Sequence, residues 1–307
     1  MKRVIITGCS GMIGSALLRL FVRKKIKVYA IIRPYSKRRN NVPDSPYIQI
    51  IECDISKLLD LKTQIKEKCD AFFHLAWQGT FGDSRNDMYL QNKNIRYTID
   101  AVTLANYLGC SVFLGAGSQA EYGRVEGKLS YDTPVNPENG YGMAKLCAGQ
   151  MSKVLCERYR IKHIWARILS IYGPFDGEHT MVMTGIYKML SGEIPSFTKA
   201  EQEWDYLYCD DAAKALYLAA EKGKDGSVYC IGSGVAKPLV DYITCIRDIV
   251  APGRDIDFGA IPYNEKQVMY LCADIENLQR DTGFVPEISF DEGIKKTVKW
   301  IKEGEIK

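Results

Sequence analysis

Tyr141 and Lys145 are the residues of this 307-residue chain whose types and spacing point most directly to chemistry. They stand four positions apart in a segment that we expect to be helical, so their side chains would share one helix face. A free tyrosine, with a pKa of about 10, is a poor acid–base group at neutral pH. A neighbouring ammonium group stabilises the phenolate and brings the tyrosine pKa toward the working range. The pair is therefore a candidate acid–base centre, although nineteen tyrosines make a chance match easier.

A glycine-rich turn near the start of the chain suggests a bound cofactor. Gly8, Gly11 and Gly14 follow the apolar run 4–7 and precede the helix-forming run 15–22. Glycine lets a strand-to-helix turn reverse tightly and lets a pyrophosphate approach the helix N-terminus. The G-x-x-G-x-x-G spacing departs from the common G-x-G-x-x-G fingerprint, and a plain loop is the alternative. We predict a dinucleotide site that involves Gly8, Ser10, Gly11, Met12, Ile13 and Gly14.

The junction after the predicted strand 27–32 bears on the choice of cofactor. An acid at this point would bind the ribose 2′-OH of NAD, whereas an arginine accommodates the 2′-phosphate of NADP. Here Arg33 follows the strand without an acid, and four of the seven residues 33–39 are cationic. A solvated basic loop is the alternative. We expect NADP(H) to be favoured over NAD(H), with Arg33 and Arg38 near the phosphate.

The elements that must position these residues alternate along the chain. Apolar runs predict strands at 4–7, 27–32, 47–52, 71–76, 111–115 and 163–168, and helices are expected at 92–108 and 141–159. This alternation predicts an α/β fold, a doubly wound parallel sheet of the Rossmann type.

After residue 172 the elements shorten and turn residues become denser, with helices expected at 211–222 and 239–250. We predict a dinucleotide-binding domain at 1–172 and a smaller C-terminal substrate-binding lobe at 173–307, interleaved with the first.

Composition excludes several classes of protein. The chain is 46% hydrophobic and 25% charged, which is ordinary for a globular protein. A net charge of +4 argues against a nucleic-acid partner. Ten cysteines without C-x-x-C spacing and three histidines predict reduced thiols and no metal site. No run approaches the roughly 18 apolar residues of a membrane helix, and no signal peptide is evident, so we expect a cytoplasmic protein without a membrane partner.

Taken together, the glycine turn and the Tyr141-x-x-x-Lys145 pair resemble those of the extended short-chain dehydrogenases/reductases. This family comprises NAD(P)-dependent nucleotide-sugar epimerases, dehydratases and reductases. The resemblance covers nearly the whole chain and also rests on six further segments, at 53–55, 74–76, 94–95, 118–123, 172–174 and 205–211.

The resemblance implies a role for each matching residue. Ser118 would orient a substrate hydroxyl or carbonyl, Tyr141 would be the acid–base, Lys145 would hold the ribose, and Asn94 would support a water relay. Further cofactor contacts would come from Asp54, Ile55, Leu75 and Ala76, and substrate contacts from Trp77, Gln78, Ser118, Gln119, Ser170 and Trp204. The residues alone leave other interpretations open: Ser118 caps a turn, Asn94 is a helix-surface residue, Trp77 packs in the core, and His74 is structural.

Two departures from the family pattern concern the substrate. Trp204 stands where the family often has an arginine that contacts the diphosphate, and Tyr263 lies near the place of a second one. Either other groups hold the diphosphate or the substrate lacks a nucleotide.

The family's dehydratases carry Asp-Glu directly after the catalytic Ser/Thr, but this chain has Gln119 and Ala120, which cannot transfer a proton near pH 7. In an extended segment, Glu121 would not point where Ala120 does.

We therefore expect an NADP(H)-dependent oxidoreductase of a nucleotide-activated deoxysugar, a 4-keto-sugar reductase with Tyr141 as proton donor. The first alternative is an NAD(P)-dependent nucleotide-sugar C4 epimerase. A dinucleotide-sensing module without turnover is a more remote one, because a sensor does not need Ser118, Tyr141 and Lys145. The helices 92–108 and 141–159 resemble those that pair in the family's four-helix dimer, which implies a homodimer. The sequence names neither the sugar, the nucleotide nor the stereochemistry.

Overall fold

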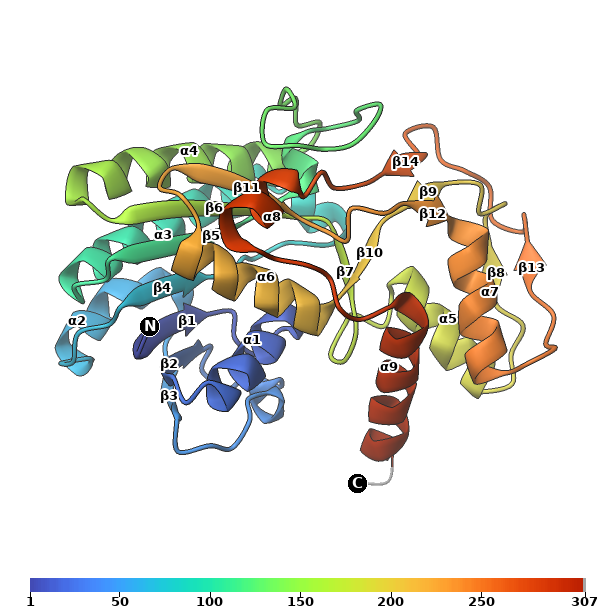
Figure 1. Cartoon of the computed structure of the whole chain (residues 1–307), viewed down its shortest axis with the longest axis horizontal. Helices are drawn as coiled ribbons and strands as arrows, with labels where there is room; N and C mark the ends of the chain where they lie inside the picture. The colour runs from blue at the N-terminus through green and yellow to red at the C-terminus, as the bar shows by residue number, and fades with distance from the viewer. Residues whose placement is uncertain (306–307) are drawn as a thin grey trace.

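A seven-stranded parallel sheet forms the larger part of the computed structural model, which describes residues 1–305 (Figure 1). Its strand order is β11-β6-β5-β4-β1-β2-β3. The strands are β1 (Arg3–Thr7), β2 (Lys27–Ile32), β3 (Ile48–Glu52), β4 (Ala71–His74), β5 (Val112–Ser118), β6 (Lys162–Ile168) and β11 (Ser227–Ile231). This arrangement confirms the predicted doubly wound Rossmann fold.

Helices cover both faces of this sheet, as a parallel sheet requires. On one face lie α1 (Met12–Arg23) and α6 (Cys209–Lys222), and on the other α3 (Met88–Tyr107) and α4 (Gly140–Tyr159). Along β1 the side chains alternate, because Val4 and Ile6 enter the first apolar cluster while Ile5 enters the second. Shorter helices in this part are η1 (Arg39–Asn41), η2 (Ile55–Asp60), α2 (Leu61–Gln64), η3 (Gly82–Asn86) and η4 (Gln119–Glu121).

A smaller lobe, on the right of Figure 1, collects the short elements of the C-terminal part. Its strands are β7 (Ser170–Tyr172), β8 (Ser196–Phe197), β9 (Glu203–Trp204), β10 (Tyr206–Tyr208), β12 (Lys237–Pro238), β13 (Asp257–Phe258) and β14 (Tyr270–Leu271). The remaining helices are α5 (Met181–Leu190), α7 (Leu239–Val250), α8 (Glu276–Thr282) and α9 (Phe290–Glu305). Because α6 and β11 return to the large sheet, the chain beyond residue 172 contributes to both parts. Within residues 1–305, no helix has the length and apolar composition needed to span a bilayer.

Two buried aspartates connect these parts of the chain. The Asp205 carboxylate accepts hydrogen bonds from the backbone N–H groups of Ser233 (2.8 Å), Gly234 (3.0 Å) and Ala273 (3.0 Å). Asp211, on α6, likewise accepts backbone N–H groups of the segment that precedes α9. Charge-assisted bonds of this kind are stronger than neutral ones. The acidic segment 205–211 therefore ties the small lobe to the sheet.

Candidate active site

A cavity of about 590 Å³ opens at the carboxyl ends of β1, β2 and β4. Ligands of doubly wound sheets bind at this edge, where the strand order reverses. The predicted residues that line the cavity are Gly8, Ser10, Gly11, Arg33, Arg38, Ile55, Leu75, Ala76, Trp77 and Gln78. Six other predicted cofactor residues, Met12, Ile13, Gly14, Asp54, Tyr141 and Lys145, do not line it.

The glycine turn brings backbone segments unusually close together. Gly8 has a positive φ of +72°, and a Cβ there would lie 2.7 Å from the backbone nitrogen of Ala76. A Cβ at Gly14 would lie 2.3 Å from the Gly8 carbonyl oxygen, so Gly14 serves the packing of α1 against the turn. Gly11 begins α1 without a side-chain cap, and the first turn of α1 contains no acid. These features fit a pyrophosphate at the helix N-terminus.

A second cavity of about 570 Å³ adjoins the first and is markedly basic. It shares Arg33, Ser36 and Arg38 with the larger cavity and adds Lys37 and Asp54. The Asp54 carboxylate caps η2 by accepting hydrogen bonds from the backbone N–H and hydroxyl of Ser56, which lower its pKa, as does the charge of Arg33. Arg39 is instead ion-paired with Glu52 at 2.5 Å. The cations predicted to meet a 2′-phosphate therefore lie around a single hollow.

Ser118, Tyr141 and Lys145 come together beside the larger cavity. Tyr141 and Lys145 project from the start of α4, where Asn139 caps the helix, and Ser118 ends β5. The Lys145 Nζ lies 5.7 Å from the Tyr141 ring centroid and donates a hydrogen bond to the Ala116 carbonyl at 2.6 Å. Burial lowers the pKa of Lys145 to about 7, against the opposing charge of Glu121.

The expected lowering of the tyrosine pKa by the neighbouring ammonium is wrong, because the pKa of Tyr141 is raised and the side chain stays protonated at neutral pH. Burial raises the pKa of Tyr141, while a hydrogen bond with the Ser118 side chain and the charge of Arg85 both lower it. The Arg85 guanidinium carbon lies 4.6 Å from the centroid of the tyrosine ring. Arg85 comes from η3, and no motif in the sequence marked it. A protonated tyrosine beside a cofactor cavity can donate its proton to a carbonyl oxygen.

Trp77 and Asn94 complete the wall around this group. The Trp77 ring meets the Tyr141 ring edge-on at 6.1 Å and lies 3.8 Å from the Lys145 Nζ. Asn94 is 1% exposed, so the helix-surface interpretation is wrong. Its side chain accepts the Gln78 N–H at 3.0 Å and donates to the Gln78 carbonyl at 2.9 Å. Asn94 thus fixes the loop that carries Trp77 and Gln78.

Two neighbours complete this part of the structure. Gln91, which sequence reasoning missed, accepts a hydrogen bond from the Trp77 indole N–H at 2.9 Å and donates to the Gly79 carbonyl at 2.8 Å. His74 hydrogen-bonds to the Thr7 hydroxyl at 3.0 Å, and burial lowers its pKa to about 3. A buried, neutral His74 fits the structural interpretation.

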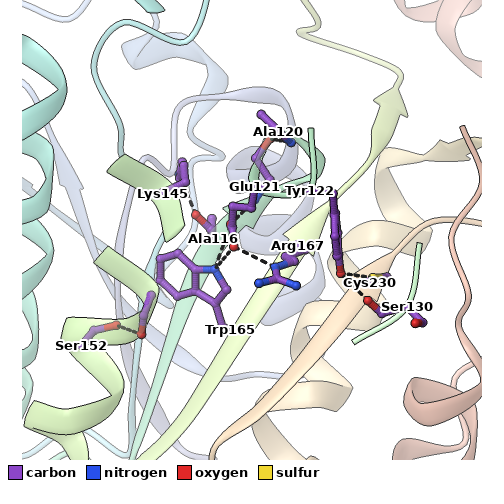
Figure 2. Close-up of polar contacts among 12 residues, drawn as sticks. Ala116, Ala120, Glu121, Tyr122, Ser130, Lys145, Ser152, Trp165, Arg167 and Cys230 are labelled. Carbon is purple, nitrogen blue, oxygen red and sulfur yellow. Dashed lines mark hydrogen bonds and ion pairs between the residues drawn. The ribbon is translucent and has the colours of Figure 1, made fainter. Parts of the chain in front are cut away.

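The segment after Ser118 differs from expectation. We predicted an extended segment, but residues 119–121 form η4, a single helical turn. Ser118 caps it, because its Oγ accepts the Ala120 N–H at 3.2 Å while Glu121 Oε1 accepts the Ser118 N–H at 2.8 Å. The turn directs Glu121 into the protein interior, where it is 0% exposed and forms an ion pair with Arg167 at 2.7 Å (Figure 2). The capping interpretation of Ser118 therefore holds together with its place beside Tyr141.

The predicted substrate residues of the small lobe touch each other. The Trp204 indole N–H donates to the Ser170 hydroxyl at 2.8 Å, which joins β9 to β7. The Tyr263 hydroxyl accepts the Glu201 N–H at 3.0 Å. Neutral aromatic groups thus stand where arginines were expected. Gln119, beside Ser118, has a buried Oε1 without a hydrogen-bond partner in the described structure.

Across residues 1–305, no group of three or more His, Cys, Asp or Glu side chains is placed to hold a metal ion. What the residues do assemble is a cofactor cavity, a buried ammonium, and a protonated tyrosine that faces a serine.

Comparison with known proteins gives a consistent result. The model of the NAD dependent epimerase/dehydratase family matches residues 4–232, from β1 through β11. A relative from Methanocaldococcus jannaschii, provisionally named UDP-glucose 4-epimerase, is 26% identical over 316 residues, which cover 98% of this chain and 99% of the relative.

Solved structures agree on the fold. A UDP-glucose 4-epimerase from Thermotoga maritima, solved with UDP-glucose, gives a TM-score of 0.89 at 22% identity and covers 99% of both chains. A dTDP-glucose 4,6-dehydratase from Streptomyces venezuelae, solved with NAD, gives 0.87 at 20% identity and covers 99% of this chain and 98% of the other. Because the family model spans most of the chain and the fold agrees throughout, this protein belongs to the NAD-dependent epimerase/dehydratase family of nucleotide-sugar oxidoreductases.

Proposed function

We propose that the protein is an NADP(H)-dependent reductase of a nucleotide-linked 4-keto-6-deoxy sugar. The observation that carries this proposal is the Ser118–Tyr141–Lys145 group beside a cofactor cavity whose extension is lined by Arg33, Lys37 and Arg38. Three cations around one hollow favour a 2′-phosphate over a free ribose hydroxyl. The proposal includes a nucleotide-sugar substrate between this group and the Ser170–Trp204 contact of the small lobe.

In the proposed reaction a bound nicotinamide would supply the hydride for the keto carbon. The Tyr141 hydroxyl donates a proton to the keto oxygen, so the C=O bond becomes CH–OH by the addition of one hydride and one proton. Ser118 orients the carbonyl, since it lies beside Tyr141 and is anchored through its own backbone. Lys145 stabilises the phenolate that remains on Tyr141. Asn94 holds the loop of Gln78 against the cofactor cavity.

Elimination of water from the sugar is not supported by these side chains. A 4,6-dehydration needs an acid and a base beyond the hydride machinery. Gln119 and Ala120 stand after Ser118, and Glu121 is buried in its ion pair with Arg167. An amide and a methyl group cannot transfer protons near pH 7.

A C4 epimerase is the second candidate. It is favoured by the names of the relatives from Methanocaldococcus jannaschii and Thermotoga maritima. The same Tyr141 would take the proton from the C4 hydroxyl and later return it to that oxygen. A bound nicotinamide would accept the C4 hydride and give it back to the opposite face of C4, without net use of cofactor. NAD in the Streptomyces venezuelae dehydratase likewise makes NAD(H) the alternative cofactor.

The deciding experiment is turnover with defined sugars. Purified protein is incubated with the dTDP, UDP and CDP forms of 4-keto-6-deoxyglucose and with NADPH or NADH, and absorbance at the nicotinamide band is followed. We expect NADPH to be oxidised in proportion to alcohol product and faster than NADH. Tyr141→Phe should lower kcat by about 10²–10⁴-fold, because it removes the transferable proton.

Two outcomes would contradict the proposal. Interconversion of UDP-glucose and UDP-galactose without cofactor consumption would make the protein an epimerase. Formation of a 4-keto-6-deoxy product from a nucleotide-glucose would make it a dehydratase.

A further inference from the structure

A narrow slot lies directly behind the catalytic group, between the sheet and α4. Gly115 and Gly117 of β5 and Gly149 of α4 face it, and the indole of Trp165, on β6, fills it. A Cβ at these glycines would lie 2.3, 2.4 and 2.7 Å from indole atoms. Distances this short are not tolerated by real side chains, so glycine at these three positions makes room for the indole.

The indole in this slot holds a carboxylate. Its N–H faces both Glu121 oxygens, at 3.0 and 3.2 Å, and Arg167 Nε donates to Glu121 Oε2 at 2.7 Å (Figure 2). Ser118 N–H donates to the other oxygen at 2.8 Å. Both charged side chains are buried, with exposures of 0% for Glu121 and 7% for Arg167.

Stability alone does not account for such a pair. Apolar residues of similar volume often replace a buried ion pair without loss of stability, because desolvation offsets the attraction. The Glu121–Arg167 ion pair, which lies behind the proposed active site, therefore has an explanation other than stability. The Glu121 carboxylate anchors Ser118 through a hydrogen bond, and its charge acts on Lys145 and Tyr141.

Among the carboxylates of residues 1–305, Glu121 is the one whose charge raises the pKa of Lys145. The hydrogen bond of Lys145 goes to the Ala116 carbonyl, so Glu121 acts on Lys145 through its charge. From β4, His74 faces Lys145 but is neutral, since its pKa is lowered to about 3. From η3, the cation Arg85 faces Tyr141 and acts in the opposite sense to Glu121.

Cys230 and Tyr122, on the other side of the Glu121 carboxylate, do not supply a negative charge in its place. Burial raises the pKa of the Cys230 thiol, on β11, to about 11 and also raises that of Tyr122. Both are therefore neutral at pH 7. Arg167 is the cation on this side, and its guanidinium lies 4.4 Å from the Tyr122 ring.

We propose that Glu121, held by Trp165 and Arg167, is a positioning residue of the active site that anchors Ser118 and places a buried negative charge behind Tyr141 and Lys145. This rests on the proposed function of Ser118, Tyr141 and Lys145. Glu121 acts through these residues and does not itself meet the substrate.

The test is Glu121→Gln, which keeps the shape but removes the charge. We expect kcat for NADPH-dependent reduction to fall about 10- to 100-fold, less than the full contribution of a general acid, with the KM for NADPH unchanged. Glu121 raises the pKa of both Lys145 and Tyr141, so its loss lowers both. The alkaline limb of the pH profile should therefore move to lower pH.

Two further variants separate this role from a purely structural one. Glu121→Gln/Arg167→Met removes both buried charges, so thermal stability should return toward wild type while the alkaline limb stays displaced. Asp281→Asn is the matched control, because Asp281, on remote α8, is 4% exposed and paired with Lys224 and Arg280. It should lower stability without moving the pH profile. A profile that coincides with wild type in Glu121→Gln, or that returns with stability in the double variant, would overturn the proposal.

A measurement without substrate keeps the two proposals distinguishable. The Lys145 signal in ¹³Cε-lysine-labelled protein, assigned with Lys145→Met, is titrated by NMR in wild type and Glu121→Gln. We expect a lower pKa of Lys145 in the variant, and an unchanged pKa would overturn the role of Glu121. Absence of any keto-sugar turnover by wild type would instead count against the proposed function alone.

Discussion

At the scale of single residues, the proposed choice of NADP(H) can be tested at Arg33. Its side chain lines both the cofactor cavity and the basic hollow beside it. Arg33→Asp should weaken NADPH binding by about 10- to 100-fold, since a hydrogen bond to a charged group contributes roughly 1.5–3 kcal/mol. NADH binding should change little, because its ribose carries no phosphate. Fluorescence titration of both cofactors measures the difference.

The matched control for this change is Arg158→Asp, on the exposed end of α4 and outside both cavities. It introduces the same charge difference and should leave both affinities unchanged. Equal affinity of the wild-type protein for NADPH and NADH would show that the basic hollow does not select the cofactor.

At the scale of elements, we expect the packing of β5 against β6 to hold Ser118, the proposed catalytic serine, in place. A Cβ at Gly117 would lie 2.4 Å from the Trp165 Nε1 and 2.5 Å from Glu121 Oε1. Gly117→Ala should therefore lower the free energy of unfolding by about 1–3 kcal/mol, as overpacking does in well-packed cores. Turnover should fall with it, because the displaced Glu121 also anchors Ser118. Urea unfolding and kcat are the two measurements.

Gly304→Ala, at an exposed position near the end of α9, is the control for this substitution. No heavy atom lies within 4 Å of the Cβ it would add. Alanine there should leave stability unchanged or raise it by up to about 1 kcal/mol through helix propensity. A Gly117→Ala protein as stable and active as wild type would show that the slot is not tightly closed.

At the scale of the whole molecule, an apolar stripe on α4 predicts association with a second copy. Met143, Met151 and Val154 are 49%, 48% and 67% exposed, and Cys147 stands between them at helical spacing. Exposed apolar faces of this kind mark interaction sites, and the resemblance to the family implies a four-helix dimer of α3 and α4. We propose a homodimer across this face. Met151→Asp/Val154→Asp should give a monomer in sedimentation equilibrium, since two desolvated carboxylates oppose association.

Val285→Asp is the comparison for the dimer test, because Val285 is 55% exposed and lies outside the stripe. It should leave the association state of the protein unchanged. A wild-type protein that sediments as a monomer at micromolar concentration would contradict the dimer.

Much of the fold follows from the sequence because the responsible interactions are local. The bounds predicted for β2 and α7, 27–32 and 239–250, are those observed. The glycine turn is a local device, since its three glycines stand within one strand–helix junction. Tyr141 and Lys145 share a face because helical spacing places them there, whatever surrounds the helix.

The tertiary structure alone decided which side chains meet across distant segments. Arg85 reaches Tyr141 from η3, and Asn94 is buried because its amide pairs with the backbone of Gln78. The conformation of residues 119–121 differs from our expectation, because they form a helical turn and not an extended segment, and Glu121 pairs with Arg167 on β6. Periodicity and motif spacing report the backbone near a residue. A buried charge takes its place according to partners that only the packed sheet and helices bring within reach.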